Sequence, residues 1–410
     1  MNGERDGLTR GGRSASAADV ATPGSLTLAA DRSAQPIAIV AGEASGDLLG
    51  SLLIRSLREA GLKAGFIGIA GPKMQAVGAR SLFPMEALSV RGYIEALGSV
   101  WKILGIRRRL KKRLLDTPPR LFIGVDAPDF NLALETRLKR AGIATIHFIS
   151  PSIWAWRPQR IHKMARAASH VLLVFPFEEA IYQQAGIPAT YVGHPLAHML
   201  PQPDRRAARE RLGLRQAGEF VALLPGSRLS EVKALGRLYV EAAKRIAQAR
   251  PQTHFLIPLV NRETRQEFER ILDQADAGEL SLRILFGHAH DAMQAADAAL
   301  IASGTATLEA LLLDCPHLIS YRVPWLTWQL MKRQALLPWI GLPNILAGRD
   351  LVPELIQDQA TPEALADGIV RLLADPNMQR AQIEEFRIQR ARLKRDTPRL
   401  IAQAVRPFLE

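Results

Sequence analysis

The sequence predicts an α/β protein with two parallel-sheet domains, and three observations support this. Short apolar runs alternate with helical patterns from Ile37 onward, which is typical of βαβ units. The alternation pauses at 201–215, a polar stretch rich in proline and arginine, and then resumes. The chain has 410 residues, which is too long for one compact core. We therefore expect two Rossmann-like domains of similar size with a cleft between them.

The apolar runs supply the expected strands. In the first half these are Ile37–Ala41, 66–70, Leu121–Val125, 145–149 and 171–175, with helical patterns such as 48–60 and 131–141 between them. In the second half they are 220–224, 254–258, Leu282–Phe286, Ala298–Ala302 and 318–322.

The same pattern divides the chain into four parts. We expect a first domain at 37–200, a second domain at 215–375, and C-terminal helices at 376–410 that pack back on the first domain or on a partner subunit. Residues 1–36 are rich in Ala, Ser, Gly and Thr and lack a continuous apolar core, so we expect a mostly disordered extension there.

Composition limits the functions open to the chain. Apolar residues make up 48% and charged residues 23%, and no run approaches the ~18 to 20 apolar residues that span a bilayer. Cys315 is the single cysteine, so no intrachain disulfide can form and a reducing compartment fits. The net charge of +13 favours contact with nucleic acid, anionic lipid or phosphorylated substrates.

Two acids follow the expected strand Leu121–Val125. Asp126 and Asp129 flank Pro128, at the kind of strand end where open α/β sheets bind ligands. The pair is therefore a candidate catalytic site. The plainer interpretation makes Asp126 a helix cap and Asp129 a turn residue.

The first strand runs into Gly42-Glu-Ala-Ser-Gly-Asp47, where glycines let a ligand approach the backbone. This loop has neither the Gly-x-Gly-x-x-Gly nor the Walker A pattern. Glu43 and Asp47 would repel a phosphate, so Glu43 and Ser45 suit a sugar or acceptor better. A plain tight turn, with Asp47 near the helix start, is the alternative.

A loop at 151–160 carries two tryptophans and two arginines after the strand expected at 145–149. Trp154 and Arg157 in this loop suit stacking on sugar faces and charge-assisted hydrogen bonds to phosphate. Alternatively, the indoles pack on the domain.

Two loops of the second half predict a nucleotide site. In the first, Gly226, Ser227 and Arg228 form a possible pyrophosphate cradle before a helix, unless Glu231 pairs with Arg228 instead. The second loop places Ser303, Gly304 and Thr305 at a helix N-terminus. Its Glu309 could accept hydrogen bonds from a ribose diol.

Three other positions leave alternatives open. Asn344 reads a base or the donor sugar, or forms a structural turn. His194 is a structural residue at a domain edge or a substrate contact. His288-Ala-His290-Asp291 looks like a metal-binding fragment, but Asp291 as a helix N-cap explains it, and we expect no metal site.

The most basic window, 102–120, holds eight Lys or Arg residues against Asp116 alone and lies beside apolar residues that include Trp101. Such a helix suits an anionic membrane surface. The alternative is a buried amphipathic helix with a solvated basic end. No nucleic-acid-binding module is recognisable, so we expect no nucleic acid partner.

Taken together, these motifs resemble the lipid-A-disaccharide synthase family (glycosyltransferase family 19). The resemblance runs from about Ile37 to the C-terminus. The motifs are, in chain order, Ala41-Gly-Glu-Ala-Ser-Gly-Asp47, Gly124-Val-Asp-Ala-Pro-Asp-Phe-Asn131, Pro151-Ser-Ile-Trp-Ala-Trp-Arg157, Gly193-His-Pro195, Leu224-Pro-Gly-Ser-Arg228, Ser303-Gly-Thr-Ala-Thr-Leu-Glu309 and Gly341-Leu-Pro-Asn344.

The resemblance implies an inverting GT-B glycosyltransferase that needs no metal or other cofactor. It would join UDP-2,3-diacylglucosamine to 2,3-diacylglucosamine 1-phosphate (lipid X), giving lipid A disaccharide 1-phosphate and UDP in lipid A biosynthesis. The family's location implies a cytoplasmic protein, peripheral on the anionic inner-membrane surface, and a homodimer is possible. Another GT-B enzyme of UDP-sugars, such as a UDP-N-acetylglucosamine 2-epimerase, is the alternative.

Roles follow for the candidate residues. Asp126 is the first choice for the base that takes the proton of the acceptor hydroxyl, and Glu43 is its rival. Residues expected to bind substrate are Ser45, Asp129, Asn131, Trp154, Arg157 and His194. Residues expected to bind UDP are Gly226, Ser227, Arg228, Ser303, Gly304, Thr305, Glu309 and Asn344.

Overall fold

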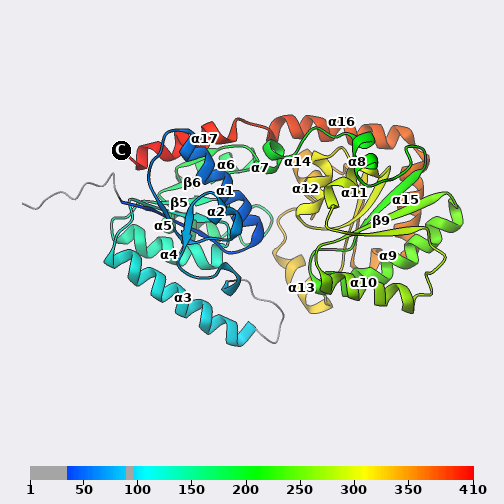
Figure 1. Cartoon of the computed structure of the whole chain (residues 1–410), viewed down its shortest axis with the longest axis horizontal. Helices are drawn as coiled ribbons and strands as arrows, with labels where there is room; N and C mark the ends of the chain where they lie inside the picture. The colour runs from blue at the N-terminus through cyan, green and yellow to red at the C-terminus, as the bar shows by residue number, and fades with distance from the viewer. Residues whose placement is uncertain (1–34, 89–95) are drawn as a thin grey trace, which may run out of the picture.

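The computed structural model describes residues 35–88 and 96–410, except for the side chains of 96–100, 326 and 330. The expected extension at 1–36 therefore lies almost wholly outside the described residues. Figure 1 shows two α/β domains side by side, joined along one side by the long C-terminal helices. None of the helices in the described ranges is long and apolar enough to cross a membrane.

Each domain is built on one parallel sheet. The seven-stranded sheet of the first domain has the order β3-β2-β1-β4-β5-β6-β7, and the six-stranded sheet of the second has the order β10-β9-β8-β11-β12-β13. The strands of the first sheet are β1 (Ile37–Ala41), β2 (Phe66–Ile69), β3 (Ala79–Ser81), β4 (Leu121–Val125), β5 (Thr145–Phe148), β6 (His170–Leu173) and β7 (Ala189–Tyr191). Those of the second are β8 (Glu219–Leu224), β9 (Thr253–Leu259), β10 (Leu282–Phe286), β11 (Ala298–Ala302), β12 (His317–Tyr321) and β13 (Glu354–Ile356).

The strand order reverses once in each sheet. The reversal falls between β1 and β4 in the first domain and between β8 and β11 in the second. Open α/β sheets bind ligands at such switch points, outside the carboxyl ends of the strands. The loops after these four strands carry most of the candidate residues.

Helices connect the strands and cover the sheets. In the first domain they are α1 (Ala44–Glu59), α2 (Pro72–Ala76), α3 (Ala96–Asp116), α4 (Pro128–Arg140), α5 (Arg160–Ala167), α6 (Glu178–Gln184) and α7 (Pro195–Met199). The second domain contains α8 (Arg205–Arg211), α9 (Leu229–Ala249), α10 (Arg262–Gln274), α11 (Ala289–Ala295), α12 (Thr305–Leu312), α13 (Trp325–Gln334), α14 (Leu342–Ala347) and α15 (Pro362–Ala374). The chain ends with α16 (Pro376–Leu393) and α17 (Thr397–Val405).

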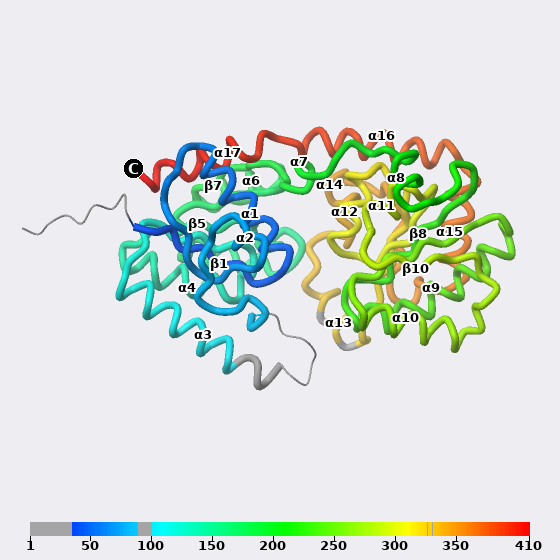
Figure 2. Tube along the Cα trace, in the orientation of Figure 1, coloured from blue at the N-terminus to red at the C-terminus, as the bar shows by residue number. Residues whose placement is uncertain are grey.

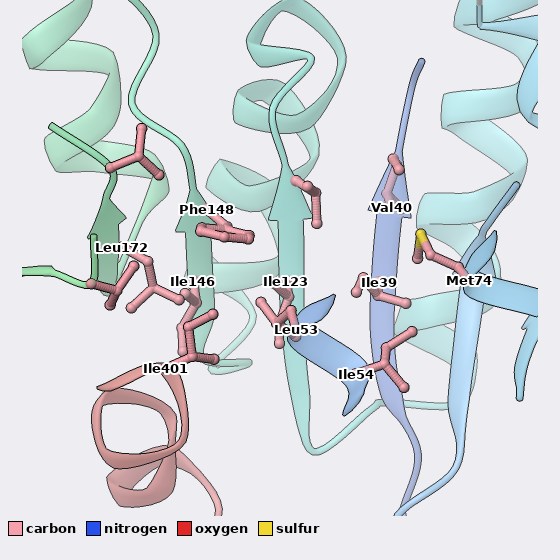
Figure 3. Packing of buried hydrophobic residues seen from close by; sticks show 14 of the residues in the cluster. Ile39, Val40, Leu53, Ile54, Met74, Ile123, Ile146, Phe148, Leu172 and Ile401 are labelled. Carbon is pink, nitrogen blue, oxygen red and sulfur yellow. The ribbon is translucent and has the colours of Figure 1, made fainter. Parts of the chain in front are cut away.

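The C-terminal helices link the domains. Figure 2 shows α16 running over the second domain and α17 lying on the first. Ile401 of α17 belongs to the same buried cluster as Leu53 and Ile54 of α1 and the strand residue Ile146 (Figure 3). The apolar side chains of α17 therefore complete the core of the domain that the N-terminal half builds.

The sequence located the long elements better than the short ones. The expected strands at Ile37–Ala41, Leu121–Val125, Leu282–Phe286 and Ala298–Ala302 are found with the same bounds, whereas the three-residue edge strands β3, β7 and β13 were missed. The stretch 201–215, expected to be a linker, contains α8. Arg209 in α8 is buried and donates to Ala295 O at 2.9 Å, so this segment packs on the second domain.

Candidate active site

The turn after β4 carries Asp126 in a strained backbone conformation. Asp126 and Ala127 have φ values of 51° and 46°, a left-handed region that non-glycine residues rarely adopt. The Asp126 amide donates to Phe148 O at 2.9 Å. The N-cap of α4 is Ala127 and no side chain caps this helix, so the interpretation of Asp126 as a helix cap is wrong.

Glu43 lies beside this turn. Strands β1 and β4 are hydrogen-bonded neighbours with Ala41 opposite Val125, and a Cβ added at Gly42 would lie 2.8 Å from the Cβ of Ala127. The two strand ends are thus in contact, and Asp126, one residue beyond Val125, shares one edge of the sheet with Glu43, two residues beyond Ala41. Glu43 occupies the N-cap position of α1, but its side chain makes no capping hydrogen bond.

The neighbouring Asp47 has a structural role. Its buried carboxylate accepts hydrogen bonds from Lys73 N at 2.9 Å and Met74 N at 3.0 Å, in the first turn of α2. Ser45, by contrast, is exposed in the first turn of α1. Of the polar residues in this loop, Glu43 and Ser45 are therefore open to a substrate.

Asn131 supports the turn from below. Its side-chain amide is fully buried and donates to Asp126 O at 2.8 Å and to Val40 O at 3.4 Å. Asn131 therefore ties β1 to the Asp126 turn, which favours a structural role over the predicted contact with substrate. Asp129 is exposed in the first turn of α4 and forms an ion pair with Arg160 at 2.9 Å.

The loop at 151–160 uses its two tryptophans differently. Trp154 packs edge-on against Phe177 and donates to the Glu178 carboxylate at 3.1 Å, so its indole packs on the domain. Trp156 is exposed, with the Arg157 guanidinium 4.3 Å from its ring centroid. No separate role was predicted for Trp156, although its ring is the more accessible of the two.

Glu178 was missed by the sequence analysis. Its carboxylate is fully buried and also accepts hydrogen bonds from Phe175 N at 3.0 Å and Val174 N at 3.3 Å. Burial raises the pKa of Glu178 to about 7, although these hydrogen bonds act to lower it. This buried acid anchors the loop that carries Trp154.

His194 has the structural role that the sequence left open. Its Nδ1 accepts the Leu196 amide at 3.2 Å at the start of α7, and its own amide donates to Leu393 O of α16 at 2.9 Å. Burial lowers the pKa of His194 to about 4, so the ring is neutral at physiological pH. This geometry corrects the prediction of a substrate contact.

A buried acid–histidine pair lies close to the Asp126 turn, and the sequence analysis did not predict it. Glu135 of α4 and His147 of β5 are fully buried, and Glu135 Oε1 lies 2.7 Å from His147 Nδ1. A Cβ at Gly124 would lie only 2.1 Å from Glu135 Oε1, so the glycine makes room for the carboxylate. No regular spacing in the sequence links these three positions.

In the second domain, Arg228 stands at the start of α9 after β8. Glu231 accepts hydrogen bonds from the amides of Ser227 at 2.9 Å and Arg228 at 3.1 Å, and its carboxylate lies 3.4 Å from the Arg228 guanidinium. The sequence left two alternatives for Arg228, a phosphate cradle or pairing with Glu231, and the structure contains the pair with Glu231. The amides of Ser227 and Arg228 are occupied, but the Arg228 side chain remains 71% exposed.

The loop after β11 begins α12. Ser303 N donates to Ser320 O at 2.9 Å, and Gly304 and Thr305 are exposed at the helix start. Glu309, one turn further on, lies 3.4 Å from His290 Nε2, and hydrogen bonding to Glu309 raises the pKa of that histidine. Since Ile301 pairs with Leu224, this loop and the Gly226–Arg228 loop leave the sheet side by side.

Asn344 is a structural residue in α14. Its amide donates to Val352 O and to Glu354 Oε1, and its oxygen accepts the amides of Leu351 and Val352, all at 2.8 or 2.9 Å. Both amide hydrogens and both lone pairs are thereby used, which favours the structural turn and corrects the prediction of a UDP contact.

Helix α11 begins at a different residue from the one predicted as its N-cap, Asp291. The N-cap of α11 is His288, and Asp291 lies inside the first turn, where it pairs with Arg211 at 2.8 Å. Asp291 is therefore not the N-cap. Over the ranges 35–88 and 96–410, no group of three or more His, Cys, Asp and Glu residues is arranged to hold a metal ion.

One segment joins the ligand-binding edges of the two sheets. Leu336 N, after α13, donates to Ala155 O of the first-domain loop at 3.0 Å. Four residues later, Ile340 O lies 3.4 Å from Ser303 Oγ. The segment 336–340 therefore contacts the loop after β5 in the first domain and the loop after β11 in the second.

Two parallel-sheet α/β domains of this kind form the GT-B fold, which glycosyltransferases and some other enzymes of UDP-sugars share. Similar folds include the glycosyltransferase of kitacinnamycin (TM-score 0.58, 16% identity, 92% of this chain and 100% of that chain). They also include Acinetobacter baumannii MurG (TM-score 0.54, 14% identity, 91% and 99%). A putative UDP-N-acetylglucosamine 2-epimerase from Listeria monocytogenes shares the fold (TM-score 0.60), at 11% identity over 86% of this chain and 90% of that chain.

The sequence comparisons are more specific. The family model described as lipid-A-disaccharide synthetase matches residues 37–405. The lipid-A-disaccharide synthases of Methylobacillus flagellatus and Azoarcus sp. are each 54% identical over 91% of this chain, covering 99% and 96% of their own lengths. The chain belongs to the lipid-A-disaccharide synthase family.

Proposed function

We propose that this hexosyltransferase joins UDP-2,3-diacylglucosamine to 2,3-diacylglucosamine 1-phosphate, releasing lipid A disaccharide 1-phosphate and UDP. The observation that supports this is the placement of two carboxylates, Glu43 and Asp126, at the switch point of one sheet, with Arg228 at the switch point of the other. An acceptor hydroxyl needs a base, and a leaving nucleotide needs positive charge.

In the proposed reaction, the acceptor 6-hydroxyl oxygen attacks the anomeric carbon of the donor. A new carbon–oxygen bond forms as the bond to the UDP oxygen breaks, and the hydroxyl proton passes to a carboxylate. We assign that role to Asp126, which is half-buried and lies on a backbone held from both sides. Hydrogen bonds to the backbone N and O of Asp126 hold the turn in its strained conformation and thereby fix the direction of the side chain.

UDP is assigned to the second domain. The exposed Arg228 guanidinium is suited to the pyrophosphate, and the free start of α12 at Gly304–Thr305 supplies amide donors and a favourable dipole. Glu309 is our candidate for the ribose hydroxyls. In the first domain, Ser45, Asp129, Trp156 and Arg157 are our candidates for contact with the sugar and phosphate groups.

The face that carries α3 is our candidate for contact with an anionic membrane. Ile106, Leu110 and Leu114 are buried, whereas Trp101 is 72% exposed beside the exposed Lys102. Figure 1 shows α13 on the same side of the molecule, and its Trp325 is 67% exposed. Exposed tryptophans next to basic residues favour the lipid interface, and both substrates carry acyl chains.

The direct test is an assay of the purified full-length chain in detergent with both lipid substrates. The proposal expects stoichiometric formation of disaccharide 1-phosphate and UDP. If the folded protein forms no disaccharide, the proposal fails. Isomerisation of a water-soluble UDP-sugar without an acceptor would instead support an epimerase.

A further inference from the structure

The Glu135–His147 pair is fully buried and is linked to both sides of the Asp126 turn. Asn131, one helical turn before Glu135 on α4, donates to Asp126 O at 2.8 Å. Phe148, the residue after His147 on β5, accepts the Asp126 amide at 2.9 Å. The helix and the strand that carry the pair therefore hold the backbone on either side of Asp126.

The pair also has unused hydrogen-bonding capacity. Among the described residues, Glu135 Oε2, His147 Nε2 and Asn131 Oδ1 are buried without a hydrogen-bond partner. Such groups are costly and uncommon in folded proteins. Two aliphatic side chains would fill this space at lower cost, so stability alone is a poor reason for an ionisable pair here.

Charge connects the pair to Asp126. Burial by itself lowers the pKa of His147, but the Glu135 carboxylate, the charge of Asp126 and a hydrogen bond to the backbone of Ile149 together raise it above its ordinary value. The neighbours of His147 across the sheet, Gly124 and Val171, are uncharged. Tyr182 of α6 keeps its proton, since burial raises its pKa, and its hydroxyl pairs with Ser150 at 2.7 Å.

We propose that Glu135 and His147 are positioning residues for proton transfer: the charged pair fixes the Asp126 turn and places a cation behind the carboxylate that receives the proton. Because the charge of Asp126 helps to raise the pKa of His147, the buried pair lies within electrostatic reach of that carboxylate. This inference rests on the proposed role of Asp126 as base.

The test compares kcat and KM across roughly pH 5 to 9 for wild type, His147→Gln and Glu135→Gln. Loss of the cation should move the acidic limb of the kcat profile up by about one pH unit, a tenfold loss of kcat at its acidic end. KM should change little, because neither side chain reaches a substrate.

His317→Gln is the matched control. His317 is also a fully buried histidine with an unpaired Nε2, but it lies on β12 of the other domain. This variant should lower the melting temperature without moving the pH profile. Superimposable profiles for wild type, His147→Gln and Glu135→Gln would overturn the proposal, as would an equal shift in His317→Gln.

Two further measurements separate the possible failures. If Asp126→Asn retains wild-type kcat, the assignment of the base is wrong. If it loses activity while the pair variants keep the wild-type profile, only the positioning role fails. Should the pair variants not fold, NMR of labelled histidines in wild type and Asp126→Asn still decides: one buried imidazolium should titrate above the ordinary range of histidine, and it should titrate lower in Asp126→Asn. A His147 that titrates within or below the ordinary range would overturn the proposal.

Discussion

The side-chain amide of Asn131 lies 2.8 Å from the backbone oxygen of Asp126 and 3.4 Å from that of Val40. One buried side chain thus joins the ends of β1 and β4, which carry the two carboxylates of the candidate site. The buried position of Asn131 between two strand ends accounts for its hydrogen bonds. The contacts of the neighbouring acids differ as well: Asp129 pairs with Arg160, whereas the Glu43 side chain does not cap α1.

Asp126→Asn should lower kcat by ~10² or more, because the amide cannot accept the proton of the acceptor hydroxyl. The measurement is steady-state formation of UDP with both lipid substrates. Asp273→Asn is the matched control, since Asp273 is an exposed acid on α10 of the other domain, and it should retain most of its activity. A larger loss in Glu43→Gln than in Asp126→Asn would transfer the role to Glu43.

Arg228→Ala should weaken UDP binding by about tenfold or more, the usual effect of losing a charge-assisted hydrogen bond to phosphate. Titration calorimetry with UDP measures this without the lipid acceptor. Arg237→Ala, an exposed arginine further along α9, should bind UDP like wild type. Equal affinities for both variants and wild type would remove Arg228 from the nucleotide site.

Gly124→Ala should destabilise the fold, because the new Cβ would lie 2.1 Å from Glu135 Oε1 and displace a buried carboxylate. We expect a loss of about 1–3 kcal/mol in the free energy of unfolding, measured with urea. Gly105→Ala in α3 meets no atom within 4 Å and should gain about 0.5–1 kcal/mol from helix propensity. Similar effects at the two glycines would contradict the packing around Glu135.

Glu178 should make stability depend on pH. Burial raises its pKa to about 7, so between about pH 4.5 and 7 the folded state keeps a proton that the unfolded state has released. The free energy of unfolding should therefore fall as pH rises through this window, by about 3 kcal/mol in total.

Urea unfolding of wild type and Glu178→Gln at several pH values tests this prediction. The free-energy difference between them should change with pH across the window and level off above it, because the variant lacks this titration. Glu59→Gln, at an exposed glutamate of α1, should run parallel to wild type. A pH-independent difference for Glu178→Gln would show that Glu178 does not titrate there.

Trp101→Ser should weaken binding to anionic vesicles by about tenfold, since burial of an exposed tryptophan at the lipid interface contributes on the order of 1–2 kcal/mol. Vesicle sedimentation measures the partition. Activity on detergent-dispersed substrates should be preserved, which separates membrane contact from catalysis. If the partition is unchanged, Trp101 does not contribute to membrane binding, and the contact would lie at Trp325 on α13 or on another face.

The sequence by itself determined the architecture and the loops to which we assign the candidate site. Apolar runs of strand length, each ending in glycines, hydroxyls or acids, predicted the loops after β1, β4, β8 and β11, because period and turn chemistry are local properties. Edge strands of three residues and helix α8 escaped prediction. Their stability comes from neighbours such as Arg209 on Ala295, which local patterns do not contain.

Tertiary structure alone decided which of the polar residues in these motifs are exposed and which are buried. Asn131, His194 and Asn344 look like site residues in their motifs, yet packing buries them, and their side chains form hydrogen bonds with other groups of the protein. Glu135, His147 and Glu178 show no motif, yet long-range contacts place them behind the candidate base and the tryptophan loop. The physical reason is that burial and hydrogen-bond partners depend on segments distant in the chain, and only the folded molecule brings those together.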